Sequence, residues 1–190
     1  LFRSQAEVKA KERLQIGRVG SRENPSSEAP NAVSSDAIAA KLRFAGTFVD
    51  DPRAVTVLAD AAKQLLAKGE YEAAAAAADE LASRSPKADL SITAFLVMGH
   101  SQFALEQFEL AEAAYATALP LLSSSDARFS DTRERIAASL YRQAELLRDD
   151  DDTRTAAAFF ERAMAAAPES DIATTALYDA ASAYHKAGDL

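Results

Sequence analysis

The chain has 190 residues, 45 of them alanine, carries a net charge of −8 at pH 7 and contains no cysteine. The absence of cysteine excludes a thiol nucleophile, a disulfide and a cysteine-ligated metal. Because phosphate neutralisation supplies most nucleic-acid affinity, a net acidic chain without a basic stripe disfavours a nucleic-acid partner.

Residues 1–34 differ in composition from the rest of the chain. Residues 1–19 mix apolar and basic side chains in a helix-compatible way, and residues 20–35 are rich in serine, proline, asparagine and glutamate. This composition predicts an N-terminal helix-prone segment followed by a flexible linker. Residues 1–34 carry six basic and four acidic side chains, and the remainder carries 15 basic and 25 acidic ones. We therefore expect a mildly basic leader on an acidic body.

A short helix is predicted over residues 36–48, within a capping segment of residues 35–53. Ser34, Ser35 or Asp36 can cap its N-terminus, and Asp51-Pro52 ends it. Its apolar residues, such as Ile38 and Leu42, lie at helical spacing. We expect this helix to pack on the helices that follow and to shield them from water.

From residue 54 onward, a skeleton of small and apolar residues recurs with the length of a helix pair. The first small residues of successive copies lie 37, 45 and 37 residues apart. Two helices approach closely only where neither presents a large side chain, so this spacing predicts antiparallel helix pairs. The small residues are Ala62 and Ala74, Gly99 and Ala111, Ala144 and Ala156, and Ala181.

Two stretches interrupt the regular pattern. Pro120 is expected to end or kink the helix before it, and the serines of residues 123–125 with Asp126 favour a loop and a following helix cap. Four aspartates at residues 149–152 stand where a glycine turn is usual. We interpret them as a solvated turn whose last acids lie at a helix N-terminus, because they lack the spaced ligands of a calcium loop.

The skeleton resembles the tetratricopeptide repeat (TPR), a 34-residue helix pair with small residues at its eighth and twentieth positions and a proline near its end. The resemblance implies an all-α fold, a right-handed α-solenoid of antiparallel helix pairs with about three and a half repeats over residues 54–190. The last copy matches only the first helix and the turn of a pair. We therefore expect the array to be truncated at its C-terminal end and to belong to a longer protein.

In TPR arrays the first helix of each pair lines a concave groove that binds a partner. Carried over position by position, the resemblance implies a partner-binding groove formed by Lys63, Leu66, Thr93, Leu96, His100, Phe103, Tyr141, Glu145, Arg148, Tyr178, Ser182 and His185. Aromatic side chains on such a surface offer a large contact area with little rotamer entropy to lose. The alternative for Phe103, Tyr141 and Tyr178 is that they pack between adjacent helices. The alternative for the two histidines is that they are ordinary polar residues of the groove without a special role in binding.

Catalytic and metal sites are not predicted. The chain has no glycine-rich phosphate loop and no G-x-S-x-G nucleophile motif. His100 and His185, its only histidines, fall in different helix pairs, which disfavours a shared metal. We expect no cofactor and no small-molecule substrate. The carboxylate clamp of chaperone-binding TPR domains is also set aside. That clamp needs a particular set of lysine, asparagine and arginine on the first helices, whereas the ninth positions here hold Lys63, His100, Glu145 and Ser182, with no asparagine where the clamp requires it.

Residues 135–145, 159–162 and 168–181 resemble long TPR proteins of Gram-negative bacteria that are associated with the cell envelope, some with TonB-type systems. The resemblance implies a non-enzymatic scaffold that binds another protein or a peptide segment, in the periplasm or envelope. Two alternatives stay open. The chain can be a regulatory or substrate-docking arm of a larger enzyme, or it can self-associate through its open last helix pair.

Overall fold

The computed structural model describes residues 34–84 and 87–188. Contacts within the chain separate it into two units, Leu1–Ala32 and Val33–Leu190, and the described residues belong to the second. The helix-prone segment and linker expected over residues 1–34 thus lie outside the described residues, apart from Ser34. The described part contains α2 (Ser35–Thr47), α3 (Ala54–Ala67), α4 (Tyr71–Ser83), α5 (Ala88–Ala104), α6 (Phe108–Ala118), a 3-10 turn η1 (Leu119–Leu121), α7 (Ala127–Asp149), α8 (Thr153–Ala166) and α9 (Asp171–Ala187).

Helix α2 is the short helix expected before the repeats. Ser34 caps it, because its hydroxyl accepts a hydrogen bond from the Ala37 amide at 3.2 Å. Ile38 and Ala45 are buried in one cluster with Leu58 of α3. Helix α2 therefore covers the start of the helix pairs with an apolar face.

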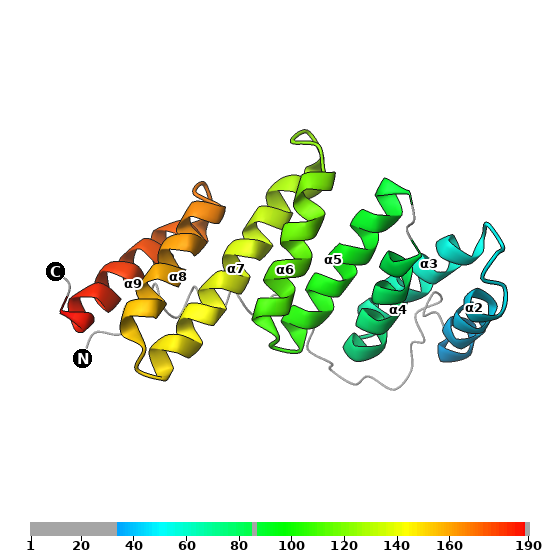
Figure 1. Ribbon diagram of the computed structural model, residues 1–190, viewed down its shortest axis with the longest axis horizontal. Helices are drawn as coiled ribbons and strands as arrows, with labels where there is room; N and C mark the ends of the chain where they lie inside the picture. The colour runs from blue at the N-terminus through cyan, green and yellow to red at the C-terminus, as the bar shows by residue number, and fades with distance from the viewer. Residues whose placement is uncertain (1–33, 85–86, 189–190) are drawn as a thin grey trace, which may run out of the picture. The chain divides into compact units, whose positions relative to one another are not determined.

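Consecutive helices pack on one another from α2 to α9 (Figure 1). Helix α3 also contacts α5, and α7 contacts α9, whereas α5 and α7 have little direct contact. No strand occurs in residues 34–84 and 87–188. The all-α prediction is confirmed, and consecutive helices form the packed pairs.

Small residues stand where the paired helices meet. Those of the first three copies are buried, as are Leu58, Leu140 and Phe160 beside them. At Gly99 of α5 the fit is closest, since a β-carbon built there would lie 2.6 Å from the Tyr115 ring of α6. Ala181 differs, because it is exposed on α9. Six of the seven small residues therefore lie at buried helix contacts.

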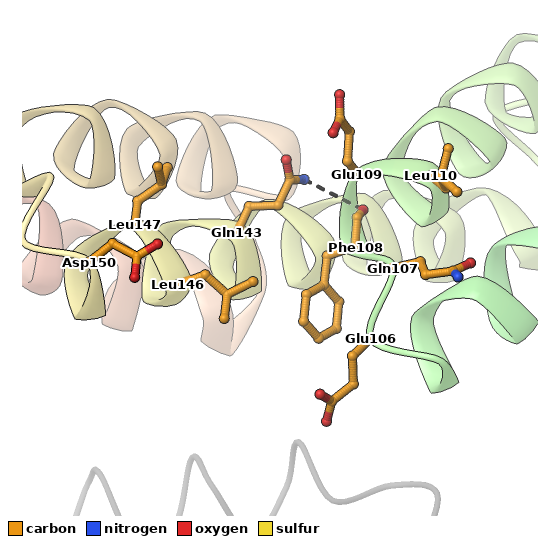
Figure 2. Close-up of a pocket in the computed structure, with 9 residues that line it drawn as sticks. All are labelled: Glu106, Gln107, Phe108, Glu109, Leu110, Gln143, Leu146, Leu147 and Asp150. Carbon is orange, nitrogen blue, oxygen red and sulfur yellow. Dashed lines mark hydrogen bonds between the residues drawn. The ribbon is translucent and has the colours of Figure 1, made fainter.

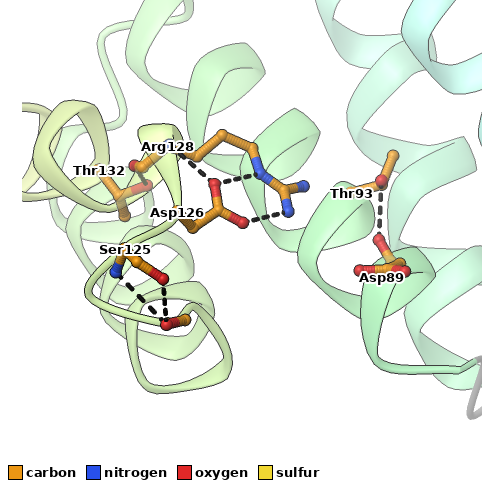
Figure 3. A network of polar contacts seen from close by, with 7 residues as sticks. Asp89, Thr93, Ser125, Asp126, Arg128 and Thr132 are labelled. Carbon is orange, nitrogen blue, oxygen red and sulfur yellow. Dashed lines mark hydrogen bonds and ion pairs between the residues drawn. The ribbon is translucent and has the colours of Figure 1, made fainter.

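The loops follow the predicted chemistry. Helix α6 ends at Ala118, and Pro120 lies in η1. Asp126 caps α7 through a 2.8 Å hydrogen bond from the Arg128 amide (Figure 3). The guanidinium of Arg128, hydrogen-bonded to the same carboxylate, lowers the pKa of Asp126 to about 2. Asp152 accepts a hydrogen bond from the Thr155 amide at the start of α8, as the interpretation of the aspartate run requires.

Many of the buried apolar residues form one cluster over α2 to α5 and a second over α7 to α9, and α6 has buried residues of its own, such as Phe108 and Tyr115. Between the clusters, α6 joins α7 through Glu112, whose carboxylate accepts hydrogen bonds from Gln143 of α7 at 2.8 Å and from Arg162 of α8 at 2.6 Å. The Arg162 guanidinium also lies 4.5 Å above the Phe159 ring. These polar contacts join α6 to α7 and α8 in addition to buried apolar residues of α6 and α7, such as Ala111, Ala114 and Ala138. None of the helices described here is long and apolar enough to cross a membrane.

Candidate functional site

A cleft of ≈ 440 Å³ opens at the junction of α6 and α7 (Figure 2). One wall is the turn after α5 together with the first turn of α6, and the other is the C-terminal part of α7. Its lining residues are Glu106, Gln107, Phe108, Glu109, Leu110, Gln143, Leu146, Leu147 and Asp150. Helices α5 and α7, each the first of its pair, have little contact with each other. This gap in the packing leaves room for the cleft.

The two walls are fixed to each other by Gln143. Its side-chain amide donates to Glu112 at 2.8 Å and, more weakly, to the Phe108 carbonyl at 3.5 Å (Figure 2). The Phe108 ring is buried, with the Phe103 ring edge-on at 5.2 Å and the Arg142 guanidinium at 5.0 Å. These contacts hold the Phe108 ring in a buried position, so the apolar surface that the cleft leaves open is that of its leucines.

Apolar and acidic side chains are combined in the cleft. Leu110 and Leu146 are 52% and 51% exposed, and they are the large apolar residues that the fold leaves open here. Figure 2 shows Leu146 across from the Phe108 ring. Three carboxylates, those of Glu106, Glu109 and Asp150, line the cleft without a basic side chain. The site therefore favours a ligand that is both apolar and positively charged.

Tyr141, one of the predicted groove residues, lies in the core. It is 8% exposed, and its ring meets the Phe160 ring edge-on at a centroid distance of 5.0 Å. Its hydroxyl donates a hydrogen bond to the Asp179 carboxylate of α9. Burial, together with this bond, raises the pKa of Tyr141. Tyr141 thus takes the alternative role of packing between adjacent helices, and it offers a partner almost no surface.

Glu145 and Arg148 are occupied by contacts within α7 and with α8. The Glu145 carboxylate pairs with Arg142 at 2.6 Å and with Arg148 at 3.8 Å. The Arg148 guanidinium also lies 5.7 Å from the Phe160 ring centroid. A partner would have to compete with these contacts, which makes the two residues weaker candidates than their positions imply.

His100 is half-buried beside Tyr115. Its Nδ1 lies 2.8 Å from the Tyr115 hydroxyl, and the rings meet edge-on. Burial lowers the pKa of His100, and the charge of Arg135 on α7 lowers it further while Asp131 partly opposes this. Burial likewise raises the pKa of Tyr115. The pair is therefore neutral and structural at pH 7.

The lowered pKa of His100 predicts a pH dependence of stability. The unfolded chain binds a proton at this histidine near its ordinary pKa of 6.5, whereas the folded chain binds it only at lower pH. The free energy of unfolding is therefore expected to be highest above pH 6.5 and to fall as the pH drops toward the folded pKa. Urea unfolding at several pH values measures this, and His100→Gln should flatten the fall. His185→Gln, at an exposed position, is the control that should leave it unchanged.

The remaining predicted groove residues differ in how much of each is exposed to solvent. Lys63, Ser182 and His185 are exposed, and Tyr178 is 75% exposed. Leu66, Thr93, Leu96 and Phe103 are half-buried, with Leu66 against the first apolar cluster. The Thr93 hydroxyl is satisfied within α5, since it donates to the Asp89 carbonyl at 2.9 Å (Figure 3). The structure does not bring these residues together with the cleft, apart from the contact of Phe103 with Phe108.

Metal-binding side chains do not cluster in the part of the chain that the structure describes. In the described ranges, no group of three histidines, aspartates or glutamates is placed to hold a metal ion. His100 and His185 lie on different helices, α5 and α9. Comparison of the chain with protein-family models, with curated proteins and with solved structures gave no match.

Proposed function

We propose that the chain is a non-catalytic protein-binding scaffold and that the cleft between α6 and α7 is a contact site for its partner. The observation that carries the proposal is the exposure of Leu110 and Leu146, which line the cleft together with the half-buried Leu147. Exposed apolar side chains grouped in a concave site are typical of surfaces that bind other molecules. A TPR-like solenoid with a concave groove, and a place in the bacterial envelope, belong to this proposal and rest on the sequence resemblance.

The chemistry of the cleft defines the partner segment. Its leucines need an apolar face, and its three carboxylates need cationic side chains next to that face. Residues 35–190 carry 15 basic and 25 acidic side chains, so the surrounding field also attracts a cation. A basic amphipathic segment of another protein meets both requirements.

A peptide-binding experiment tests this proposal. The probe is a fluorescent amphipathic helical peptide of leucine and lysine, and its counterpart with glutamate in place of lysine controls for charge. Leu146→Glu should weaken lysine-peptide binding to the full chain by about tenfold, or about 1.4 kcal/mol. Leu121→Glu is the matched control, since Leu121 is also exposed but lies in η1, outside the cleft.

Equal binding by the two variants would contradict the cleft as the contact site. Leu96→Ala separates the cleft from the predicted groove, because Leu96 is half-buried on α5 and does not line the cleft. Weakened binding in this variant alone would place the contact on the faces of α3, α5, α7 and α9. Binding of the glutamate peptide as tightly as the lysine peptide would exclude the proposed role of the carboxylates.

A further inference from the structure

The side-chain amide of Gln143, which lines the cleft between α6 and α7, has a fixed orientation. Its nitrogen donates to the Glu112 carboxylate at 2.8 Å, and it lies 3.5 Å from the Phe108 carbonyl oxygen and 3.4 Å from the Ser139 carbonyl oxygen. Each of these neighbours can only accept a hydrogen bond. The amide therefore cannot be reversed without placing its own oxygen against other oxygens.

Glu112 holds this orientation without lining the cleft itself. One oxygen of its carboxylate accepts from Gln143, and the other accepts from the Arg162 guanidinium of α8 at 2.6 Å. The same guanidinium lies 4.5 Å from the centroid of the Phe159 ring. Because side chains of α7 and α8 both bind it, the Glu112 carboxylate presents an acceptor to Gln143 in a constant place.

The other end of the amide, the Gln143 carbonyl oxygen, is an open acceptor. No donor among the described residues bonds to it, and Figure 2 shows it pointing away from Phe108. The buried side-chain atoms without a partner in the described ranges are the Ser101 hydroxyl and the Gln102 carbonyl oxygen. Since Gln143 is not among them, its oxygen is accessible to a ligand in the cleft.

The charged side chains of the cleft are acceptors as well. Glu106, Glu109 and Asp150 are exposed carboxylates, and no ion pair within the described residues involves them. Among the lining residues, only Gln107 has a side-chain N–H that is not already directed at acceptors of the chain. A surface of this kind binds a ligand through the N–H donors of the ligand, and a positive charge on the donor strengthens each hydrogen bond.

We propose, on the basis of the protein-binding function proposed for this cleft, that the Gln143 oxygen determines specificity by accepting an N–H of a lysine ammonium group of the partner. Glu112 is then a positioning residue, because it acts through Gln143. Attraction to the carboxylates depends on charge, whereas the hydrogen bond to an uncharged amide oxygen needs the N–H. The cleft therefore distinguishes lysine from trimethyl-lysine, which keeps the positive charge but has no N–H to donate.

Fluorescence anisotropy titration of the full chain with two helical peptides tests the proposal. Both peptides have the same leucine and lysine sequence, and in one of them every lysine is trimethylated. The trimethylated peptide should bind about tenfold more weakly, which is the loss expected for one hydrogen bond to a charged group. In Gln143→Met, whose side chain has a similar length but no amide oxygen, the ratio of the two affinities should fall most of the way to one. Gln107→Met is the matched control, because Gln107 also lines the cleft and is exposed, and it should keep the ratio of the parent chain.

Glu112→Gln tests the positioning role. An amide in place of this carboxylate can donate as well as accept, so it no longer fixes which end of the Gln143 amide faces it. The ratio of the two affinities should therefore fall in Glu112→Gln too, although the Gln143 side chain is retained. Thermal melting followed by circular dichroism verifies that the variants are folded, and Glu112→Gln supplies the comparison if Gln143→Met is not.

The outcomes separate the role of Gln143 from the function of the cleft. If the lysine peptide does not bind the full chain, both proposals are overturned. If it binds and Leu146→Glu weakens it, but trimethylation does not change the affinity of the parent chain, only the role of Gln143 is overturned. An equal ratio in Gln107→Met and in the folded Gln143→Met or Glu112→Gln variant would also overturn that role, because the carboxylates alone would then distinguish the two peptides.

Discussion

Gly99→Ala is expected to lower the free energy of unfolding by about 2 kcal/mol, even though alanine is the better helix former. A β-carbon at residue 99 would lie 2.6 to 2.8 Å from three ring atoms of Tyr115. That ring has no free space to move into, since Tyr115 is fully buried and its hydroxyl is bonded to His100. The added methyl group therefore forces α5 and α6 apart or displaces the ring.

Gly46→Ala provides the control for helix propensity. Gly46 lies in α2, and nothing lies within 4 Å of a β-carbon built there. This substitution should raise the free energy of unfolding by up to about 1 kcal/mol. Urea unfolding of the two variants gives the comparison. If both substitutions stabilised the chain, α5 and α6 would not be in the close contact that the structure shows.

Features set by neighbouring residues could be predicted from the sequence. The ends of α2, the break at Pro120 and the cap at Asp126 follow from the chemistry of a few adjacent residues, and the structure has them where the sequence places them. The buried alanines between paired helices also follow from spacing alone. A helix pair is a local unit, so its contacts are encoded within a short stretch of chain.

The cleft could not be predicted in the same way, because it depends on the angle between two helix pairs. That angle is held by Glu112 with Gln143 and Arg162, which are 31 and 50 residues away along the chain. A signal was nevertheless present in the sequence. Leu110 and Leu146 are large apolar residues at positions outside the repeating buried pattern, and such residues mark surfaces that another molecule can cover.

Tyr141 shows how a position in a repeat can mislead. The TPR resemblance places it on the groove, where loss of the ring would affect binding alone. In the structure it lies between α7, α8 and α9, against Phe160 and bonded to Asp179. Tyr141→Ala should therefore lower the free energy of unfolding by about 4 kcal/mol, since it removes a buried ring and leaves a cavity. Tyr141→Phe keeps the ring and loses only the hydrogen bond, so it should cost about 1–2 kcal/mol.

Tyr178→Ala is the matched control for Tyr141→Ala. Tyr178 lies on the neighbouring helix α9 and is 75% exposed, so its removal should change the free energy of unfolding by no more than about 0.5 kcal/mol. Urea unfolding of the three variants separates the two roles. If both alanine variants lowered the free energy of unfolding by comparably small amounts, Tyr141 would be a groove residue, as the TPR resemblance implies. A large loss for Tyr141→Ala with an intermediate one for Tyr141→Phe would instead show that this tyrosine joins α7 to α8 and α9, and that a partner must find its aromatic contacts elsewhere.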